Sequence, residues 1–219
     1  MKVLVVGANG QIGQHLVSKL QKSENHDVVA MVRKKEQADS FNQQGIETAL
    51  VDLEGSINDI ASAVQGSDAV VFTAGSGGAT GADKTMLIDL DGAIKSMKAT
   101  QQANVKRFVL VSAIGIQNYH EENHLDWIDR SSYYSAAKYY ADVWLENSDL
   151  DYTIVRPGGL TNEQGTGEVS VSEELDFEKI PREDVASAII LSLENDGTIG
   201  KAFDITSGDT AIEKAIQSF

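Results

Sequence analysis

The sequence predicts an α/β fold: a doubly wound, mostly parallel sheet with helices on both faces. Two observations support this prediction. Short apolar, β-branched runs alternate with helical patterns along the chain, and the first run ends in a glycine-rich turn that opens a helix. Alternation of this kind produces right-handed βαβ units with buried parallel strands. At 219 residues, 42% of them hydrophobic, the chain is expected to form a single domain over 1–219.

Each predicted strand is a short run rich in Val, Ile or Phe that is bounded by turn residues. In chain order, the predicted strands are 1–6, 28–32, 47–51, 69–74, 108–112, 152–155 and 202–205. The helical patterns that alternate with them cover 11–22, 36–44, 57–65, 84–104, 132–147, 182–193 and 211–217. Local start signals support some of these helices; for example, Ser56 precedes the third helix and Asp59 lies in its first turn.

Two segments that follow strand ends are rich in glycine or polar residues and are predicted to be loops. They cover 75–83 and 158–172. Open α/β sheets bind their ligands beyond the carboxyl ends of the strands. The small region that contacts a substrate is therefore expected to come mainly from 75–83, 113–132 and 158–180.

The glycine-rich turn after the first strand has the pattern of a dinucleotide phosphate site. Three glycines allow a tight turn, close approach of the backbone to a pyrophosphate, and packing of the helix on the strand. The N–H groups at the start of the helix then face the negative phosphates. The predicted contacts are Gly7, Asn9, Gly10, Gln11, Ile12 and Gly13.

The end of the second strand indicates which dinucleotide binds. Arg33 lies 20 residues beyond Gly13, and the first acidic residue after the strand is Glu36. An acid at this place binds the ribose 2′-hydroxyl of NAD, whereas a basic group accommodates the 2′-phosphate of NADP. A guanidinium suits a phosphate, so the sequence favours NADP, with NAD as the alternative.

Two further strand ends are expected to contact the cofactor. Asp52 and Leu53 follow the third strand and are predicted to lie by the adenine. Thr73, Ala74 and Gly75 follow the fourth strand and are predicted to pass under the cofactor ribose. These positions complete the predicted adenosine side of the site.

A second chemical pattern is Tyr134-x-x-x-Lys138 on the helix after the fifth strand. Residues i and i+4 share one face of a helix, so the ammonium lies near the phenol. A cation beside a phenol favours its ionised form, which suits a group that exchanges a proton. Tyr134 is therefore a candidate acid/base. The alternative is a packed aromatic helix face, because Tyr133, Tyr139 and other aromatic residues lie on the same helix.

Taken together, these motifs resemble the extended or atypical short-chain dehydrogenases/reductases, the superfamily of NAD-dependent epimerases/dehydratases and NmrA-like NAD(P)H-binding proteins. The chain is most similar to the small single-domain bacterial oxidoreductases of that group. The resemblance rests on the glycine turn, Thr73-Ala74-Gly75, the run 109–112, Tyr134-x-x-x-Lys138, Val155-Arg156-Pro157-Gly158-Gly159 and Arg182-Glu183-Asp184-Val185-Ala186.

This resemblance implies roles for individual residues. It makes Tyr134 the acid/base and Lys138 the group that contacts the nicotinamide ribose. It also makes Ser112 the residue that orients the substrate oxygen. Backbone around Pro157, Gly158 and Gly159 is implied to line the nicotinamide.

The chain departs from the family pattern at two places. Ser112 is followed by the apolar Ala113 and Ile114, where family members often have a further Ser or Thr. Asp89 occupies a position that is usually Asn. These departures concern catalysis more than cofactor binding, so a non-catalytic NAD(P)-dependent redox sensor stays an alternative to an enzyme.

The segment His120-Glu121-Glu122-Asn123-His124 matches H-E-x-x-H, a pattern in which two histidines on one helical face bind zinc. A catalytic zinc needs a third protein ligand, and no histidine follows His124. The sequence therefore predicts a polar surface segment here, and no metal site.

Composition narrows the classes of partner and location. The net charge of −15 argues against nucleic acid or anionic membranes as partners, because phosphate binding needs clustered Lys and Arg. No apolar run is long enough for a membrane span. The absence of cysteines, with a first strand at the N-terminus in place of a signal peptide, predicts a cytoplasmic protein. The sequence does not predict the oligomeric state.

The expected function is NADP-linked oxidoreduction of a small carbonyl or alcohol, with a small molecule as the only predicted partner. The short stretch after Pro157 leaves little chain for a large substrate region. A sugar epimerase or dehydratase is therefore a second alternative, beside the redox sensor.

Overall fold

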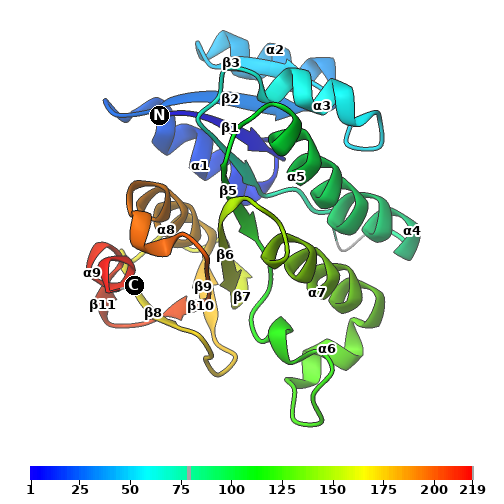
Figure 1. Ribbon diagram of the computed structural model, residues 1–219. Helices are drawn as coiled ribbons and strands as arrows, with labels where there is room; N and C mark the ends of the chain where they lie inside the picture. Colours follow the sequence, from blue (N-terminus) through cyan, green and yellow to red (C-terminus); the bar gives the residue numbers. More distant parts are fainter. Residues whose placement is uncertain (78–79, 219) are drawn as a thin grey trace.

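The computed structural model describes residues 1–77 and 80–218, and it confirms the predicted α/β architecture (Figure 1). Its main sheet has the strand order β11-β8-β10-β6-β5-β4-β1-β2-β3. All neighbouring pairs are parallel except those of β8 with β10 and β11. The strands are β1 (Lys2–Val6), β2 (Asp27–Val32), β3 (Glu47–Leu50), β4 (Ala69–Phe72), β5 (Arg107–Val111), β6 (Asp151–Pro157), β8 (Glu168–Ser172), β10 (Lys201–Ser207) and β11 (Thr210–Ala211).

Helices cover both faces of the sheet, as Figure 1 shows. On one face α1 packs on α8 and α8 on α9, and on the other α3 packs on α5 and α5 on α7. The α-helices are α1 (Gln11–Gln21), α2 (Lys35–Gln43), α3 (Ile57–Val64), α4 (Ala82–Thr85), α5 (Ala93–Gln102), α6 (Asp126–Arg130), α7 (Ser132–Glu146), α8 (Arg182–Glu194) and α9 (Ile212–Gln217). Shorter turns are the π-helical η1 (Met86–Gly92) and the 3₁₀ turns η2 (Ile116–Asn118) and η3 (Asp196–Thr198).

The alternating side chains of β1 explain why both faces are covered. Val3 and Val5 point into the cluster formed with α1 and α8, whereas Leu4 and Val6 point into the cluster formed with α3 and α5. All four are fully buried. Burial of both faces of a parallel strand requires helices on both sides of the sheet. The two clusters are the core of the fold.

The chain reverses its direction across the sheet between β1 and β4. From β1 it proceeds to β2 and β3 on one side, and it then crosses to β4 and β5 on the other. Loops after β1 and β4 therefore lead in opposite directions, which opens a crevice at the carboxyl ends of these strands. This is where doubly wound sheets bind ligands.

The prediction of a loop over 158–172 is wrong in part. The structure has strand β7 (Gly159–Thr161), which pairs with β9 (Lys179–Pro181), and the edge strand β8. In β8, Val169 and Val171 alternate with polar residues, and Val169 is fully buried against β10. The alternation of apolar and polar residues that is typical of a strand is thus present in this segment. The strand that pairs with β8 and stabilises it, however, is distant in the sequence.

The prediction of one uninterrupted helix over 84–104 is also corrected. The structure has α4, then η1, then α5. A π-helical turn inserts an extra residue per turn, and such turns often occur at functional sites. Here η1 carries Asp89 at a buried position. The fourth strand ends at Phe72, two residues earlier than predicted, so Thr73 and Ala74 belong to the loop that follows it.

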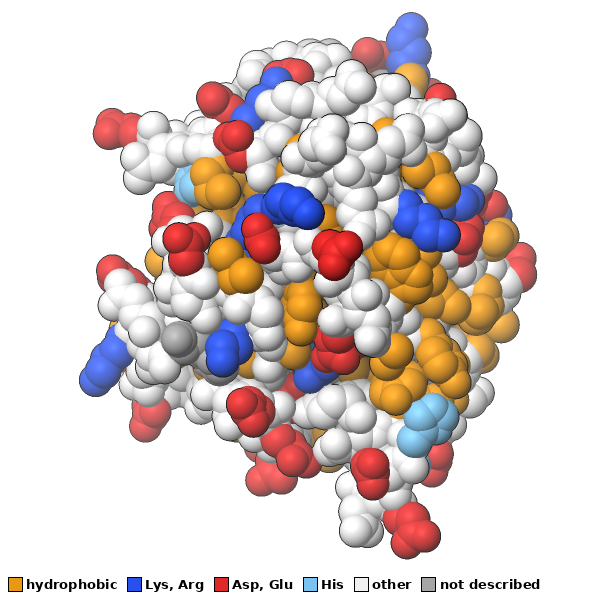
Figure 2. Space-filling view, viewed as in Figure 1, with side chains coloured by type: hydrophobic (Ala, Val, Ile, Leu, Met, Phe, Trp, Pro, Cys, Tyr) orange, Lys and Arg blue, Asp and Glu red, His pale blue; other side chains and the backbone are white. Residues whose placement is uncertain are grey.

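Charge and hydrophobicity are distributed differently on the surface. Figure 2 shows acidic side chains scattered over the visible face and hydrophobic side chains gathered over α4 and α7. Met86 and Leu87 in η1 and Tyr133 and Tyr140 in α7 are exposed. On this side the acidic side chains are therefore not gathered into a single patch.

Candidate cofactor and active site

One cavity of about 840 Å³ lies at the carboxyl ends of β1, β4 and β5. This volume is within the range of roughly 300–1,000 Å³ that is usual for small-molecule sites. The cavity brings together most of the predicted site residues, from segments far apart in the sequence. Those that line it are Gly7, Asn9, Gly10, Gln11, Ile12, Arg33, Asp52, Leu53, Thr73, Ala74, Gly75, Ser112, Tyr134 and Lys138.

The glycine turn after β1 is shaped by close backbone approaches. Gly7 has a φ of +84°, and a Cβ there would lie 2.6 Å from the Cα and N of Ala74. The N–H of Gly10 donates to the Gly7 carbonyl at 2.9 Å, and a Cβ on Gly10 would lie 3.1 Å from that oxygen. Side chains at these two positions would fill the turn, so glycine leaves its backbone open to the cavity.

The first turn of α1 offers uncompensated donors to the cavity. Gly10 caps α1 without a side chain that accepts from the first-turn N–H groups, and that turn contains no acidic residue. Gln11 and Ile12 line the cavity at this helix end. Free N–H groups at the positive end of a helix bind phosphate. The residues present therefore fit the pyrophosphate of a dinucleotide.

Gly13 does not line the cavity but lies behind the turn. A Cβ there would collide with the Gly7 carbonyl oxygen and would lie 2.8 Å from the Ala8 carbonyl oxygen. Gly13 therefore allows α1 to approach the end of β1 closely. Gly13 was predicted both to contact the pyrophosphate and to let the helix pack on the strand, and its position supports the packing role.

Arg33 follows β2 directly and lines the cavity with an exposed guanidinium. It makes no hydrogen bond or ion pair with any described residue. No acidic residue lies at the end of β2. Asp52, beyond β3, accepts from the N–H of Glu54 at 3.0 Å, which holds its carboxylate in a turn. This rim of the cavity thus presents one free guanidinium.

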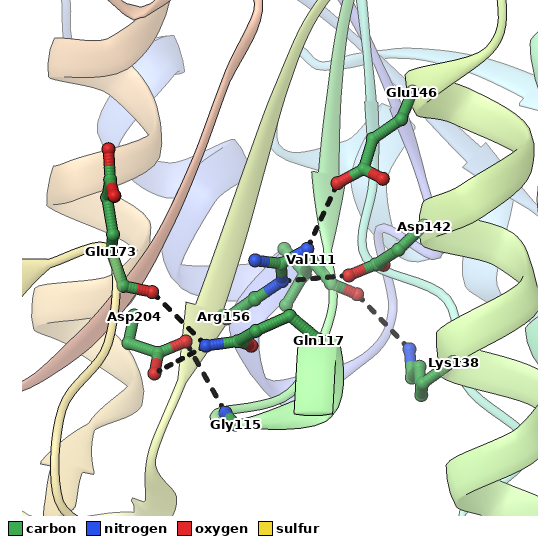
Figure 3. Close-up of polar contacts among 9 residues, drawn as sticks. All are labelled: Val111, Gly115, Gln117, Lys138, Asp142, Glu146, Arg156, Glu173 and Asp204. Atoms are coloured by element: carbon green, nitrogen blue, oxygen red, sulfur yellow. Dashed lines mark hydrogen bonds and ion pairs between the residues drawn. The ribbon is translucent and has the colours of Figure 1, made fainter. Parts of the chain in front are cut away.

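Tyr134 and Lys138 meet as the helical spacing predicts. The Lys138 Nζ lies 5.7 Å from the centroid of the Tyr134 ring. Tyr134 is half-buried, and Lys138 is buried. The ammonium donates to the Val111 carbonyl at 3.1 Å, so it is held against the end of β5, as Figure 3 shows. Tyr134 thereby stands beside a fixed positive charge.

Asp89 supplies the countercharge for this buried lysine. Its Oδ1 lies 3.6 Å from the Lys138 Nζ, and its Oδ2 accepts from the N–H of Ser76 at 2.9 Å. Burial alone lowers the pKa of Lys138, but Tyr134, Asp89 and Asp142 together raise it above its ordinary value. The departure from Asn at this position therefore gives Lys138 a charged partner, which the sequence alone did not reveal.

Ser112 lies between the cavity and a buried ionic cluster. Arg156 donates from Nε to Asp142 at 2.9 Å and from its second nitrogen to Glu146 at 3.2 Å (Figure 3). Burial raises the pKa of Asp142 above its ordinary value, while Arg156 and the Ser112 hydroxyl oppose that rise. Neither Ser112 Oγ nor Asp142 Oδ1 makes a hydrogen bond of standard geometry among the described residues. The Ser112 hydroxyl thus lies close to the Asp142 carboxylate at the border of the cavity.

Pro157, Gly158 and Gly159 do not line the cavity. Gly158 donates to the Ile205 carbonyl and Gly159 to the Glu178 carbonyl, each at 2.9 Å. These bonds fix the turn that leads into β7. The next residue, Leu160, lines the cavity instead. Of this turn, the cavity is therefore lined by Leu160, while the three predicted residues lie beside it.

Two of the segments predicted to contact a substrate are joined by the buried carboxylate of Asp204. It accepts from the N–H of Gly115 at 3.4 Å, from Gln117 Nε2 at 3.3 Å and from the N–H of Leu175 at 3.1 Å. Burial raises the pKa of Asp204 above its ordinary value, and these hydrogen bonds together with Arg156 oppose the rise. Asp204 thus fixes the loops after β5 and β8 to the sheet, and Figure 3 shows its contacts with Gly115 and Gln117.

Several residues that line the cavity were not named individually from the sequence. Those that fall in the segments predicted to contact a substrate are Ser76, Gly77, Thr80, Arg130, Ser131 and Leu160. Those that no site prediction covered are Val6, Met31, Val32, Gln37, Val51, Thr85, Ile88, Asp89, Val111, Tyr133 and Arg182. Of these, Tyr133 is next to Tyr134 in the chain, so that motif offered a local signal. Of the segment 75–83, residues 78 and 79 lie outside the described residues.

The segment with the H-E-x-x-H spacing forms a turn and not a helix. The ring of His120 packs on Tyr119 and Tyr139. His124 instead contacts the Glu121 carbonyl at 2.6 Å and Asp129 at 3.1 Å. The described residues contain no group of three or more side chains placed to hold a metal ion. Likewise, none of the helices in 1–77 and 80–218 has the length and apolarity of a membrane span.

Comparison with known proteins identifies the family. A family model described as NAD(P)H-binding matches residues 7–196. YhfK of Bacillus subtilis, named an uncharacterized sugar epimerase, is 52% identical over 217 residues, which are 99% of each chain. A Bacillus halodurans structure named as an NAD-dependent epimerase/dehydratase is 42% identical, with a TM-score of 0.91 over 100% of both chains. The oxidoreductase ylbE from Lactococcus lactis is 33% identical, with a TM-score of 0.90 over 100% of this chain and 96% of its own. These matches confirm the resemblance found in the sequence: the chain belongs to the NAD(P)H-binding family, among relatives named as epimerases/dehydratases and oxidoreductases.

Proposed function

We propose that this protein is an NADP(H)-dependent oxidoreductase that interconverts a small carbonyl compound and its alcohol. One observation carries the proposal. Tyr134 and Lys138 line the same cavity as the glycine turn of the NAD(P)H-binding site. A group able to exchange a proton therefore lies in the space where a nicotinamide cofactor would be held.

The residues of the cavity have distinct roles in this reaction. A nicotinamide cofactor, when bound, supplies or accepts the hydride. During reduction Tyr134 donates a proton to the carbonyl oxygen, and during oxidation it takes the proton back. Lys138, held by the Val111 carbonyl and Asp89, keeps a positive charge beside the phenol and is placed to contact the nicotinamide ribose. Ser112 orients the substrate oxygen.

NADP is the proposed cofactor because of the charge at the end of β2. The free guanidinium of Arg33 can bind a 2′-phosphate, and no carboxylate lies at that strand end to accept from a ribose hydroxyl. The glycine turn and the first turn of α1 would hold the pyrophosphate. Asp52 and Leu53 would lie by the adenine, and Thr73 to Gly75 would lie under the ribose.

The test is NADPH consumption with a panel of aldehydes, ketones and quinones. Removal of a general acid lowers rates by about 10²–10⁴-fold, so Tyr134→Phe should reduce turnover by that order while NADPH affinity stays constant. Tyr140→Phe is the matched control, since this exposed tyrosine on the same helix lies outside the cavity. Lys138→Met should lower both turnover and cofactor affinity. Equal turnover by Tyr134→Phe and the parent would contradict the assignment.

A second candidate function is epimerisation of a sugar, which the name of the Bacillus subtilis relative favours. In this reaction the hydride leaves a carbinol carbon and returns to its opposite face, so cofactor is not consumed. The two functions are separated by incubating the NADP-loaded protein with nucleotide sugars and following configuration by NMR. Inversion without net NADPH oxidation supports the epimerase. If neither activity is found and NADP(H) changes which proteins co-purify, the redox-sensor alternative gains support.

A further inference from the structure

The arginines of the chain fall into two groups. Arg107, Arg156 and Arg182 each donate to a carbonyl or side-chain oxygen. Arg33 and Arg130 donate to no described residue, and both line the cavity. In a chain of net charge −15 with five arginines, the two unpaired guanidinium groups face the same space. Each is therefore available to an anionic group of a ligand.

The two free arginines lie at different ends of the cavity. Arg33 follows β2, on the side of β1 that the proposed function assigns to the adenosine half of the cofactor. Arg130 ends α6, and Ser131 alone separates it from α7, where the N–H of Tyr134 donates to the Ser131 carbonyl at 2.8 Å. Arg130 is thus tied to the end of the cavity that holds the acid/base. The cofactor's 2′-phosphate and pyrophosphate already have partners in Arg33 and α1.

Neighbouring carboxylates do not neutralise Arg130. Asp129 pairs with His124 at 3.1 Å, and Asp126, one helical turn before Arg130, forms no ion pair with it. Among the described residues, two acidic side chains line the cavity. Asp52 lies near the adenosine end, and Asp89 is paired with Lys138. The charge of Arg130 therefore acts on whatever occupies the space beside Tyr134.

Apolar side chains lie at the same end. Tyr133 is 47% exposed and Leu160 is 37% exposed, and both line the cavity. Large hydrophobic side chains left open in a cavity favour an apolar ligand body. Beside Tyr134 the cavity thus offers the guanidinium of Arg130 and two apolar surfaces. Arg182 also lines the cavity, but it donates to Asn162 Oδ1 at 2.8 Å.

We infer that the substrate is a carbonyl compound with an apolar body and a carboxylate, and that Arg130 binds this carboxylate beside Tyr134. The inference rests on the proposed oxidoreductase function and names its substrate class. A planar guanidinium binds a carboxylate through two parallel hydrogen bonds. In the reaction, the hydride goes to the carbonyl carbon and the Tyr134 proton to its oxygen. The carboxylate itself is unchanged.

The test compares 4-carboxybenzaldehyde with its neutral methyl ester, methyl 4-formylbenzoate. For the parent protein, kcat/KM should favour the acid by about tenfold or more, the factor expected from a charge-assisted hydrogen bond. Arg130→Ala should remove this preference by lowering kcat/KM for the acid while kcat/KM for the ester stays unchanged. Arg130→Lys should restore part of the preference. Lys22→Ala, which removes an exposed cation at the end of α1, is the control for net charge. An unchanged preference in Arg130→Ala overturns the inference and leaves the proposed function standing.

A binding measurement tests the carboxylate site at Arg130 independently of whether the protein reduces the aldehyde. The carboxylate 4-(hydroxymethyl)benzoate is titrated by calorimetry into protein saturated with NADPH, because an alcohol and the reduced cofactor do not react. Affinity about tenfold or more lower for Arg130→Ala than for the parent supports the site, even if neither aldehyde is reduced. Equal affinities, or no binding to the parent, overturn the inference. Failure of reduction with intact carboxylate binding counts against the proposed reaction only.

Discussion

The Lys138 Nζ lies 3.6 Å from Asp89 Oδ1 in a pair whose side chains are 7% and 2% exposed. The two residues come from different helical segments, α7 and the π-helical η1. A buried charge left without its partner is strongly destabilising. Asp89 also accepts from the N–H of Ser76, so it joins the loop after β4 to the Tyr134 helix. This pair therefore connects the cofactor side of the cavity to its acid/base.

Replacement of Asp89 by alanine is expected to destabilise the fold by about 3–5 kcal/mol, the usual cost of breaking a buried ion pair from one side. Asp89→Asn should cost less, because the amide oxygen can still accept from Ser76. Urea unfolding at neutral pH measures both. The control is Asp91→Asn, which breaks the exposed pair with Lys95 on the same stretch of chain and should cost about 0–1 kcal/mol. Equal costs at positions 89 and 91 would refute the role given to the buried pair.

The same pair predicts how stability changes at alkaline pH. The pKa of Lys138 is raised above its ordinary value of 10.5, so the folded protein holds this proton more tightly than the unfolded chain does. The stabilisation that the Lys138–Asp89 pair contributes is complete below pH 10.5 and is lost as the pH rises through the raised pKa of Lys138. Neutral pH is therefore the correct condition for comparing the Asp89 variants.

Arg33→Ala should weaken NADPH binding selectively. A charge-assisted hydrogen bond contributes roughly 1.5–3 kcal/mol, so the dissociation constant for NADPH should rise by about tenfold or more. NADH, which has no 2′-phosphate, should bind the variant and the parent equally. Calorimetric titration of both cofactors into both proteins measures this directly. Equal affinity of the parent for NADPH and NADH would contradict the NADP assignment.

The predicted site residues that line the common cavity are those with local causes. The turn from Gly7 to Gly13 and the i,i+4 pair of Tyr134 and Lys138 depend on spacing within one element, and Arg33 depends on the end of one strand. Their positions around a common cavity follow from parallel strands whose carboxyl ends share one edge. The alternation of strand and helix patterns in the sequence was likewise sufficient to predict the order of the main elements along the chain.

The features that could not be predicted depend on contacts between distant segments. Asp89 is adjacent to Lys138 only because η1 packs on α7, and no pattern in either segment specifies that contact. Leu160 lines the cavity from β7, whose pairing with β9 joins segments that no local pattern relates. Arg130 is informative only once it is known to be unpaired and to line the same cavity as Tyr134. Such relationships require the tertiary structure.

The last prediction concerns Asp204, whose buried carboxylate holds Gly115 and Leu175. Its pKa is raised above the ordinary value of 3.8, chiefly by burial. The folded protein therefore binds this proton more tightly than the unfolded chain, and the free energy of unfolding decreases as the pH rises from 3.8 through the raised pKa. Asp204→Asn removes the titration and keeps an amide oxygen as acceptor, so the decrease should become shallower.

Urea midpoints of the parent and of Asp204→Asn, measured in steps from about pH 5 to pH 8, test this expectation. The pKa of Glu183 is lowered, chiefly by its hydrogen bond to the Gly165 N–H, so its opposite contribution is confined to pH values below its ordinary 4.5 and stays outside this range. Contributions shared by both proteins, including that of His124, cancel in the difference. Asp209→Asn, which removes an exposed carboxylate near the end of the same strand, controls for net charge. If the Asp204 and Asp209 variants have the same slope as the parent, the Asp204 carboxylate does not titrate differently in the folded and unfolded states, and its proposed contribution to the pH dependence is wrong.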